Sequence, residues 1–161
     1  MLNYQSPLSR KLTAFVALSD ADLATLARFD LRRRVFQPGH EMIHEGQANS
    51  RAFVLADGWA CSYKLLPDGR RQIVNFAMPG DMIGLQGTLM GDMQHSVEAL
   101  SPMLLCVFQR EELMSLYKAH PALAYDVTWI AAREETILDE NLLSVGRRNA
   151  LERLAYLLSF I

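Results

Sequence analysis

The chain has 161 residues, of which 50% are hydrophobic and 21% are charged, and its 16 basic and 18 acidic side chains give a formal net charge of −2. This composition excludes an intrinsically disordered chain, a collagen-like repeat and a disulfide-stabilised scaffold, and it supplies the core of one domain. The near-neutral charge also excludes a strongly basic surface for nucleic acid.

The sequence contains no window of about 18 uncharged apolar residues, so we expect no membrane span and no membrane partner. The first residues, MLNYQSPLSRKL, lack the apolar stretch of a secretory signal. The two cysteines, Cys61 and Cys106, fit a reducing compartment. We therefore expect a cytoplasmic protein.

Residues 1 to about 30 predict helices. Ser19 and Asp22 form the acidic variant of a capping box before one helix. Apolar residues then follow at helical spacing at Leu23, Leu26, Ala27 and Phe29. A further turn or two is indicated before it by Leu8, Leu12, Phe15 and Val16.

Residues 33 to about 110 predict short strands, because eight of the nine glycines fall here and turn signals recur every 7 to 12 residues. That spacing is typical of a β-sandwich or barrel. Residues 59–65 alternate large apolar with small or polar side chains, as a half-buried strand does. Pro67-Asp68-Gly69 predicts a hairpin turn into a strand at 72–76, and Pro79-Gly80-Asp81 predicts another turn.

From Glu111 onward the pattern is helical, and Pro121 suits the first position of a helix that continues to about Val145. Such a helix is about 37 Å long, at about 1.5 Å per residue. One apolar stripe carries Leu123, Ile130 and Ile137. A second stripe has heptad spacing, is interrupted by Glu134 and Asn141, and consists of Ala124, Val127, Ala131, Leu138 and Val145.

The first stripe can pack on the strands, whereas the second needs a partner, most simply the same helix of a second copy. The alternative is one wide buried face in a monomer. We expect Gly146 to break the helix and Arg147-Arg148-Asn149 to begin another, through Leu158. That helix leaves apolar side chains for a further segment to cover, namely Leu154, Leu157, Leu158 and Phe160.

Three sequence segments, in the order in which they occur, resemble the sensor half of the cyclic AMP receptor/fumarate-nitrate regulator (CRP/FNR) family of bacterial transcription factors, in its alpha-proteobacterial form. They are residues 58–73, 79–84 and 147–155. The resemblance implies an α+β fold: a double-stranded β-helix, or jelly roll, with N-terminal helices and a long C-terminal dimerisation helix. It implies a cyclic-nucleotide-binding-like sensor domain at 1–120, a dimerisation helix at 121–146, and at 147–161 the start of a winged helix-turn-helix.

The implied function is an effector-sensing and dimerisation module of a transcriptional regulator. Its implied partners are a second copy, promoter DNA through the missing C-terminal domain, and RNA polymerase. The dimer residues would be Val127, Ala131, Leu138, Asn141 and Val145. The alternatives are a cyclic-nucleotide-binding regulatory domain of a channel or kinase, a cupin-type metalloenzyme, and a haem or redox sensor.

The resemblance also places an effector pocket at Gly84, Leu85, Gln86, Gly87, Thr88, His95 and Ser96. In nucleotide-binding members a Glu stands at the position of Leu85 and accepts a ribose hydroxyl, and an Arg stands at the position of His95 and pairs with the cyclic phosphate. Leu85 accepts no hydrogen bond, and a neutral His is no substitute for a guanidinium. We therefore expect either an effector other than cyclic AMP or a pocket without an effector.

The sequence gives little support for a bound iron–sulfur cluster, metal ion or haem. The iron–sulfur cluster of the fumarate-nitrate type needs cysteines near the N-terminus, and this chain has none before Cys61. His40, His44 and Glu45 lack the spacing of a cupin metal site. Haem could be bound by His95, His120, Cys61 or a methionine, among which Met78, Met82, Met90 and Met93 cluster in sequence. Methionine is an ordinary core filler, so we expect neither metal nor other cofactor.

Three further features have structural interpretations. We expect Cys61 to face inward and Cys106 to lie in the core, with redox sensing as the alternative. Arg32-Arg33-Arg34 is interpreted as a solvated strand edge, with contact to DNA phosphate or polymerase as the alternative. No Gly-x-Ser-x-Gly motif, P-loop or paired carboxylates in a Gly-rich pocket occur, so we do not expect an enzyme.

Overall fold

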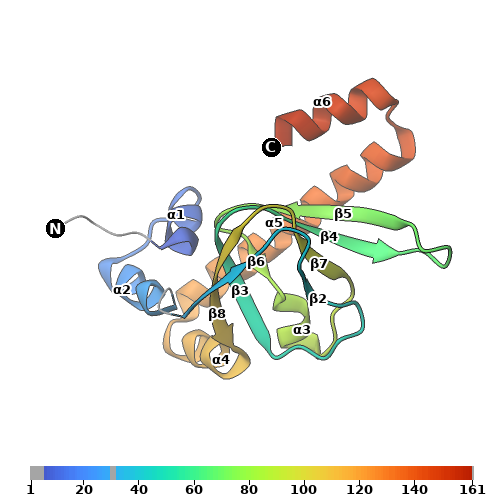
Figure 1. Ribbon diagram of the computed structural model, residues 1–161. Coiled ribbons are helices and arrows are strands. Elements are labelled where there is room, and N and C mark those ends of the chain that lie inside the picture. The colour runs from blue at the N-terminus through green and yellow to red at the C-terminus, as the bar shows by residue number, and fades with distance from the viewer. Residues whose placement is uncertain (1–5, 30–31, 161) are drawn as a thin grey trace. The chain divides into compact units, whose positions relative to one another are not determined.

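The strands of the middle zone pair antiparallel into two four-stranded sheets, in the computed structural model that describes residues 6–29 and 32–160 (Figure 1). The first sheet has the order β1-β8-β3-β6, and the second has the order β2-β7-β4-β5. The strands are β1 (Arg33–Phe36), β2 (Glu41–Ile43), β3 (Arg51–Asp57), β4 (Ala60–Leu65), β5 (Arg71–Ala77), β6 (Met82–Ile83), β7 (Ser96–Ala99) and β8 (Met103–Gln109). The expected α+β jelly roll is confirmed.

Helices flank the strands at both ends of the sequence and interrupt them once. They are α1 (Pro7–Thr13), α2 (Asp20–Phe29), α3 (Leu85–Met90), α4 (Arg110–Ala119), α5 (Pro121–Arg147) and α6 (Ala150–Phe160). The chain forms two compact units, residues 1–126 and residues 127–161, and the boundary between them falls inside α5. In the part of the chain that the structure describes, no helix combines the length and apolarity needed to cross a bilayer.

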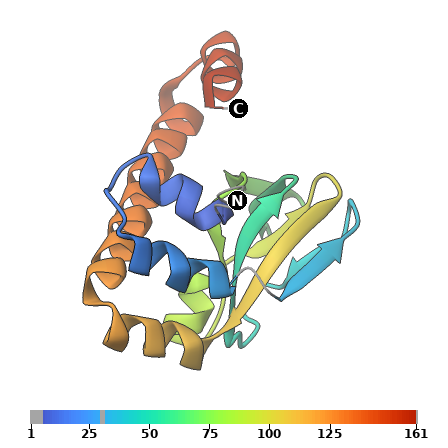
Figure 2. The same cartoon turned by 90° about the vertical axis from the view of Figure 1, so that its left-hand side faces the viewer.

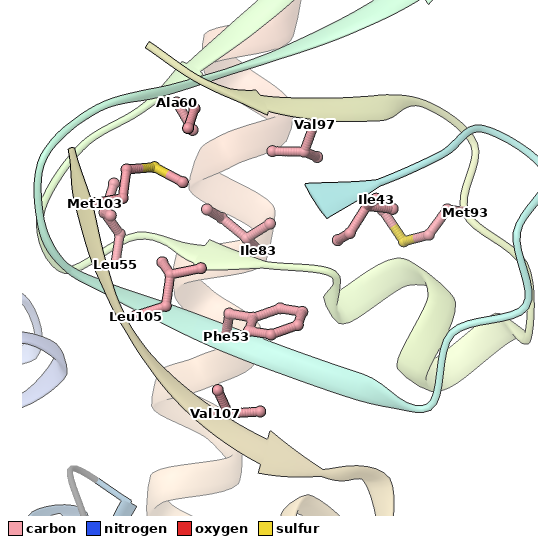
Figure 3. Packing of buried hydrophobic residues seen from close by; sticks show 11 residues of the cluster. Ile43, Phe53, Leu55, Ala60, Ile83, Met93, Val97, Met103, Leu105 and Val107 are labelled. Carbon is pink, nitrogen blue, oxygen red and sulfur yellow. The ribbon is translucent and has the colours of Figure 1, made fainter. Parts of the chain in front are cut away.

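Strand alternation fills the interior of the roll with apolar side chains from both sheets (Figure 3). Phe53 and Leu55 on β3 and Leu105 on β8 point inward from the first sheet, and Val97 does so from the second. Side chains two residues apart lie on one face of a strand, so every second residue contributes. The full cluster is Ile43, Phe53, Leu55, Ala60, Ile83, Met93, Val97, Ala99, Met103, Leu105 and Val107.

The two central strands of the first sheet, β3 and β8, are buried on their outer face as well. Val54 and Cys106, which alternate with the inward residues, are buried too. Helix α1 packs on β3, and helices α2 and α4 pack on β8 (Figure 2). Both strands therefore read as nearly continuous apolar runs, because neither face meets water.

Local signals set the ends of these elements where the sequence placed them. Asp22 Oδ2 accepts from the Ser19 amide at 3.0 Å, which confirms the capping box. In the hairpin, Gly69 has a φ of +83° and its amide donates to the Leu66 carbonyl at 2.9 Å. Pro121 begins α5 as expected.

The expected break at Gly146 is wrong, because α5 continues through it to Arg147. The next helix is set instead by a capping box, in which Asn149 Oδ1 accepts from the Glu152 amide at 3.0 Å and Glu152 Oε2 from the Asn149 amide at 2.8 Å. A glycine in the last turn of a helix costs only about 1 kcal/mol relative to alanine, which does not end a helix.

The filled interior predicts a large loss of stability for Leu105→Ala, because Leu105 is 0% exposed and lies in the middle of the cluster. We expect the free energy of unfolding to fall by about 2–5 kcal/mol, measured by urea denaturation. The matched control is Leu65→Ala on β4, where the side chain is 57% exposed, and it should change little. Equal losses in the two variants would contradict this packing.

Candidate functional site

The predicted effector cassette begins with a glycine turn that leads into α3. Gly84 has a φ of +80°, in the left-handed region, and a Cβ there would lie 2.9 Å from the Arg51 carbonyl oxygen. The Thr88 hydroxyl donates to the Gly84 carbonyl at 2.9 Å, and the Asn49 side-chain amide donates to the Arg51 carbonyl at 2.6 Å. The structure therefore brings Gly84, Leu85, Gln86, Gly87 and Thr88 together in one turn and a short helix.

On the interior side of α3, the space belongs to the core. Met93 is buried, and a Cβ on Gly87 would lie 2.8 Å from its sulfur. The Met93 side chain lies beside Ile43, with Phe53 and Val97 pointing into the same interior (Figure 3). The cassette thus packs against apolar side chains of its own chain.

Neither polar determinant of nucleotide binding stands in this cassette. Leu85 is half-buried and apolar. Burial lowers the pKa of the half-buried His95 imidazole, the charge of Lys64 lowers it further, and Glu45 opposes them. At neutral pH the ring therefore carries no charge, and it offers a cyclic phosphate none of the bidentate pairing that an arginine gives.

Ser96 is used within the protein. Its buried hydroxyl oxygen accepts from the Glu45 amide at 3.0 Å, and its hydroxyl also bonds to the Glu41 carboxylate. Burial alone would raise the pKa of Glu41, but hydrogen bonds from Ser96 and Tyr63, together with His44, lower it. Glu41 is thus held as an acceptor for two hydroxyls.

The cations next to the cassette are paired with carboxylates. Lys64 Nζ lies 2.8 Å from Glu45 Oε1. Arg71 pairs with Glu98, and its guanidinium carbon lies 4.5 Å from the centre of the Tyr63 ring. Sequence reasoning missed this network, because β7 lies between β2 and β4 in the sheet but follows both of them in the sequence.

The histidines considered for metal have other contacts. The ring of His40 lies 5.1 Å from that of Phe36, and His44 Nδ1 lies 3.0 Å from Glu41 Oε1. His120 Nε2 lies 3.3 Å from the Thr25 hydroxyl. Within residues 6–29 and 32–160, no group of three or more His, Cys, Asp or Glu side chains is arranged to hold a metal ion.

Of the clustered methionines, Met82 and Met93 are buried while Met90 is 74% exposed, so they do not share one environment. Both cysteines are buried thiols. Burial, and then the charge of Glu98, raise the pKa of Cys61, which disfavours the reactive thiolate. The inward orientation expected for Cys61 is wrong, because its neighbour Ala60 fills the interior and Cys61 lies on the opposite face of β4, paired with Glu98 on β7.

The run of arginines leads into β1 at the edge of the first sheet. Arg33 pairs in register with Cys106 on β8 and is exposed. Arg32 forms an ion pair with Glu112 of α4. Arg33 and Arg34 thus lie on an exposed edge strand, as the sequence interpretation has it.

The residues predicted for dimerisation differ in exposure within one chain. Val127 is 1% exposed, whereas Leu138 is 39% and Val145 is 47% exposed. Ala131 and Asn141 are half-buried. Asn141 Oδ1 accepts a hydrogen bond from the Tyr156 hydroxyl at 3.1 Å.

Residues 33–120 match the family model described as "Cyclic nucleotide-binding domain". The nitrogen fixation regulation protein FixK of Bradyrhizobium diazoefficiens is 34% identical over 85% of this chain and 58% of its own length. The transcriptional activator protein FnrL of Cereibacter sphaeroides is 28% identical over 87% of this chain and 55% of its own length.

Among solved structures, that of FixK2 from Bradyrhizobium japonicum superposes with a TM-score of 0.73 at 28% identity, over 79% of this chain and 63% of that one. The chain therefore spans between half and two thirds of the length of these relatives.

The paired charges and the replaced determinants predict that cyclic AMP and cyclic GMP do not bind. Isothermal titration of the purified chain with each nucleotide should give no measurable heat of binding at ligand concentrations up to about 1 mM, because a charged pair of hydrogen bonds is missing. A dissociation constant in the low micromolar range for either nucleotide would contradict this account of the cassette.

Proposed function

Because the chain belongs to the cyclic nucleotide-binding domain family and its relatives are FixK- and FNR-type regulators, we propose that it is the effector-sensing and dimerisation module of a CRP/FNR-type transcriptional regulator. Helix α5 carries the proposal. It has 27 residues, and its second half bears apolar side chains that are open to solvent. Such a face on a long helix is typical of a surface that pairs with another helix.

The exposures indicate which ridge of α5 would face the second copy. Exposed apolar side chains stand at Leu138, Leu142 and Val145, with Leu142 73% exposed. Together with Ala131 and Glu135 they are spaced four and three residues apart, as positions a and d of a heptad are. We call Ala131, Glu135, Leu138, Leu142 and Val145 the seam. It shares Ala131, Leu138 and Val145 with the predicted set, and it omits the buried Val127 and the hydrogen-bonded Asn141.

Helix α6 supports the proposal of a DNA-binding segment. Its apolar side chains Leu151, Leu154 and Leu158 are 77%, 52% and 68% exposed, and they repeat at i, i+3 and i+7. A further segment, corresponding to the part of FixK that this chain does not span, would pack on this face and read promoter DNA. RNA polymerase would then be a partner of the whole regulator.

The cassette supports a regulator that does not use cyclic AMP. Leu85, the uncharged His95 and the internally bonded Ser96 leave the cassette without the groups that hold a cyclic phosphate. The module would respond to a different small molecule or act without one. We propose that the module holds neither a metal nor haem as a resident cofactor. We also propose that its role is regulation and not catalysis.

The seam predicts a dimer that a single charge disrupts. Light scattering after size exclusion should give twice the chain mass of 18.2 kDa at tens of micromolar protein. Leu138→Glu should shift the mass toward the monomer, because it places two like charges in an apolar contact. The control is Thr136→Glu, which adds the same charge to an exposed position outside the seam. A monomeric parent chain, or equal effects of both variants, would contradict the dimer.

The regulator itself is tested on DNA. This chain alone should not shift a promoter fragment at about physiological salt, because a net charge of −2 provides no basic surface for DNA phosphates. The same chain with the remaining C-terminal part of FixK joined after Ile161 should bind the DNA site of that FixK. Leu138→Glu in this chimera should weaken the binding, and Thr136→Glu should not. Selective binding by the short chain, or no binding by the chimera, would overturn the proposal.

A further inference from the structure

The junction between α5 and α6 is very short. Helix α5 ends at Arg147 and helix α6 begins at Ala150, so Arg148 and Asn149 alone connect them. A two-residue link permits many angles between two helices unless other contacts fix one of them. The question is therefore what holds α6 where it turns back from the end of α5 (Figure 1).

Side chains of α6 satisfy the exposed end of α5. The Arg153 guanidinium donates through Nη2 to the Val145 carbonyl at 2.5 Å and through Nε to the Arg148 carbonyl at 2.8 Å. The last carbonyls of a helix have no partners within it, so these bonds cap α5 from the following helix. The capping box of Asn149 and Glu152 completes the turn on the other side.

A second set of contacts connects the link between the helices, at Arg148, to both α5 and α6. Arg148 Nη2 lies 2.8 Å from Glu140 Oε2, two turns back along α5. The Arg148 guanidinium carbon also lies 4.7 Å from the centre of the Tyr156 ring, which belongs to α6. The Tyr156 hydroxyl reaches back to Asn141 Oδ1 at 3.1 Å.

The Arg148 side chain is therefore held from two sides, by a carboxylate and by an aromatic face. Its Nη1 atom is buried and has no hydrogen-bond partner. A buried unsatisfied donor is unfavourable, so this position of the guanidinium depends on the contacts of the rest of the group.

We propose that Glu140, Asn141, Arg148 and Tyr156 form a polar clamp that makes α6 and the end of α5 one rigid helical hairpin. The clamp fixes the direction of α6, and Gly146, inside the continuous helix α5, is not the hinge. In the whole regulator, this clamp would also set the direction of a DNA-binding segment. This consequence rests on the proposed function. The clamp itself needs no DNA, dimer or effector.

Hydrogen exchange of the present chain, followed by mass spectrometry, tests the clamp. In the parent chain the amides of residues 152–156, which are hydrogen-bonded in the first turns of α6, should be protected. Arg148→Gln removes the ion pair and the cation–π contact, and Tyr156→Leu removes the ring and its hydroxyl. Each should speed exchange at these amides by roughly tenfold, the effect of losing a charge-assisted contact. Tyr156→Phe keeps the ring beneath Arg148, and it should give a smaller increase.

Matched controls separate the clamp from general effects. Arg147→Gln removes the neighbouring arginine, which is exposed, and Tyr125→Phe removes the hydroxyl of a tyrosine that is 70% exposed. Both should leave exchange at 152–156 within about twofold of the parent, and exchange in β3 should stay constant in every variant, because the change is local. Unprotected amides in the parent chain, or equal effects of Arg148→Gln and Arg147→Gln, would overturn the clamp. A monomeric chain would overturn the proposed dimer and leave this result unaffected.

Discussion

The interior of the jelly roll is filled by the chain's own apolar side chains, and the remaining features of the structure depend on this packing. Leu55 and Leu105 from one sheet and Val97 and Ala99 from the other are fully buried, so their contacts hold the two sheets together. Met93 extends the same packing up to Gly87 of the cassette. Beside the cassette, the polar side chains of Ser96, Glu41 and Tyr63 bond to groups of the same chain.

Because the interior of the roll is filled, the apolar surface that remains open to solvent lies mainly on the helices. The exposed leucines of the chain concentrate on α5 and α6, where Leu142, Leu151 and Leu158 are each more than two thirds exposed. Apolar surface of this extent on helices is unfavourable in water and is best explained by contacts with other chains or segments. The clamp at Arg148 then gives the two surfaces a fixed relation, because it joins the end of one helix to the other. The function proposed here therefore rests on α5 and α6, which carry the exposed surfaces for a second copy and for a further segment.

Features set by neighbouring residues could be predicted from the sequence, whereas contacts between residues far apart in the sequence could not. Pro121, Gly69 and the pair Ser19–Asp22 act through their immediate neighbours, so their roles could be read from a few residues. Glu41 and Tyr63 meet at Ser96 through strands that are not consecutive in sequence, and no local pattern indicates this. Asn141 fits a heptad position by spacing alone, but Tyr156, fifteen residues later, engages it.

The prediction at Gly146 failed for a different reason. The low helix propensity of glycine indicates where a helix is weak, but the capping box of Asn149 determines where the next helix begins. The hydrogen-bonding capacities of Leu85 and His95 could be read from the sequence, because they are properties of the residue type. The pairing of Lys64 with Glu45 could not, because it depends on the fold.

Cross-linking through the seam tests most directly that two copies pair along α5. In a parallel two-fold arrangement, a residue in the seam lies opposite its own copy, so a cysteine there can form a disulfide with itself. The native Cys61 and Cys106 are buried and provide a low background. Under mild oxidation Leu142→Cys should convert almost completely into covalent dimers, while Thr136→Cys, on another face of the helix, should remain largely monomeric on a denaturing gel. Equal cross-linking at the two positions, or none at Leu142→Cys, would contradict the account.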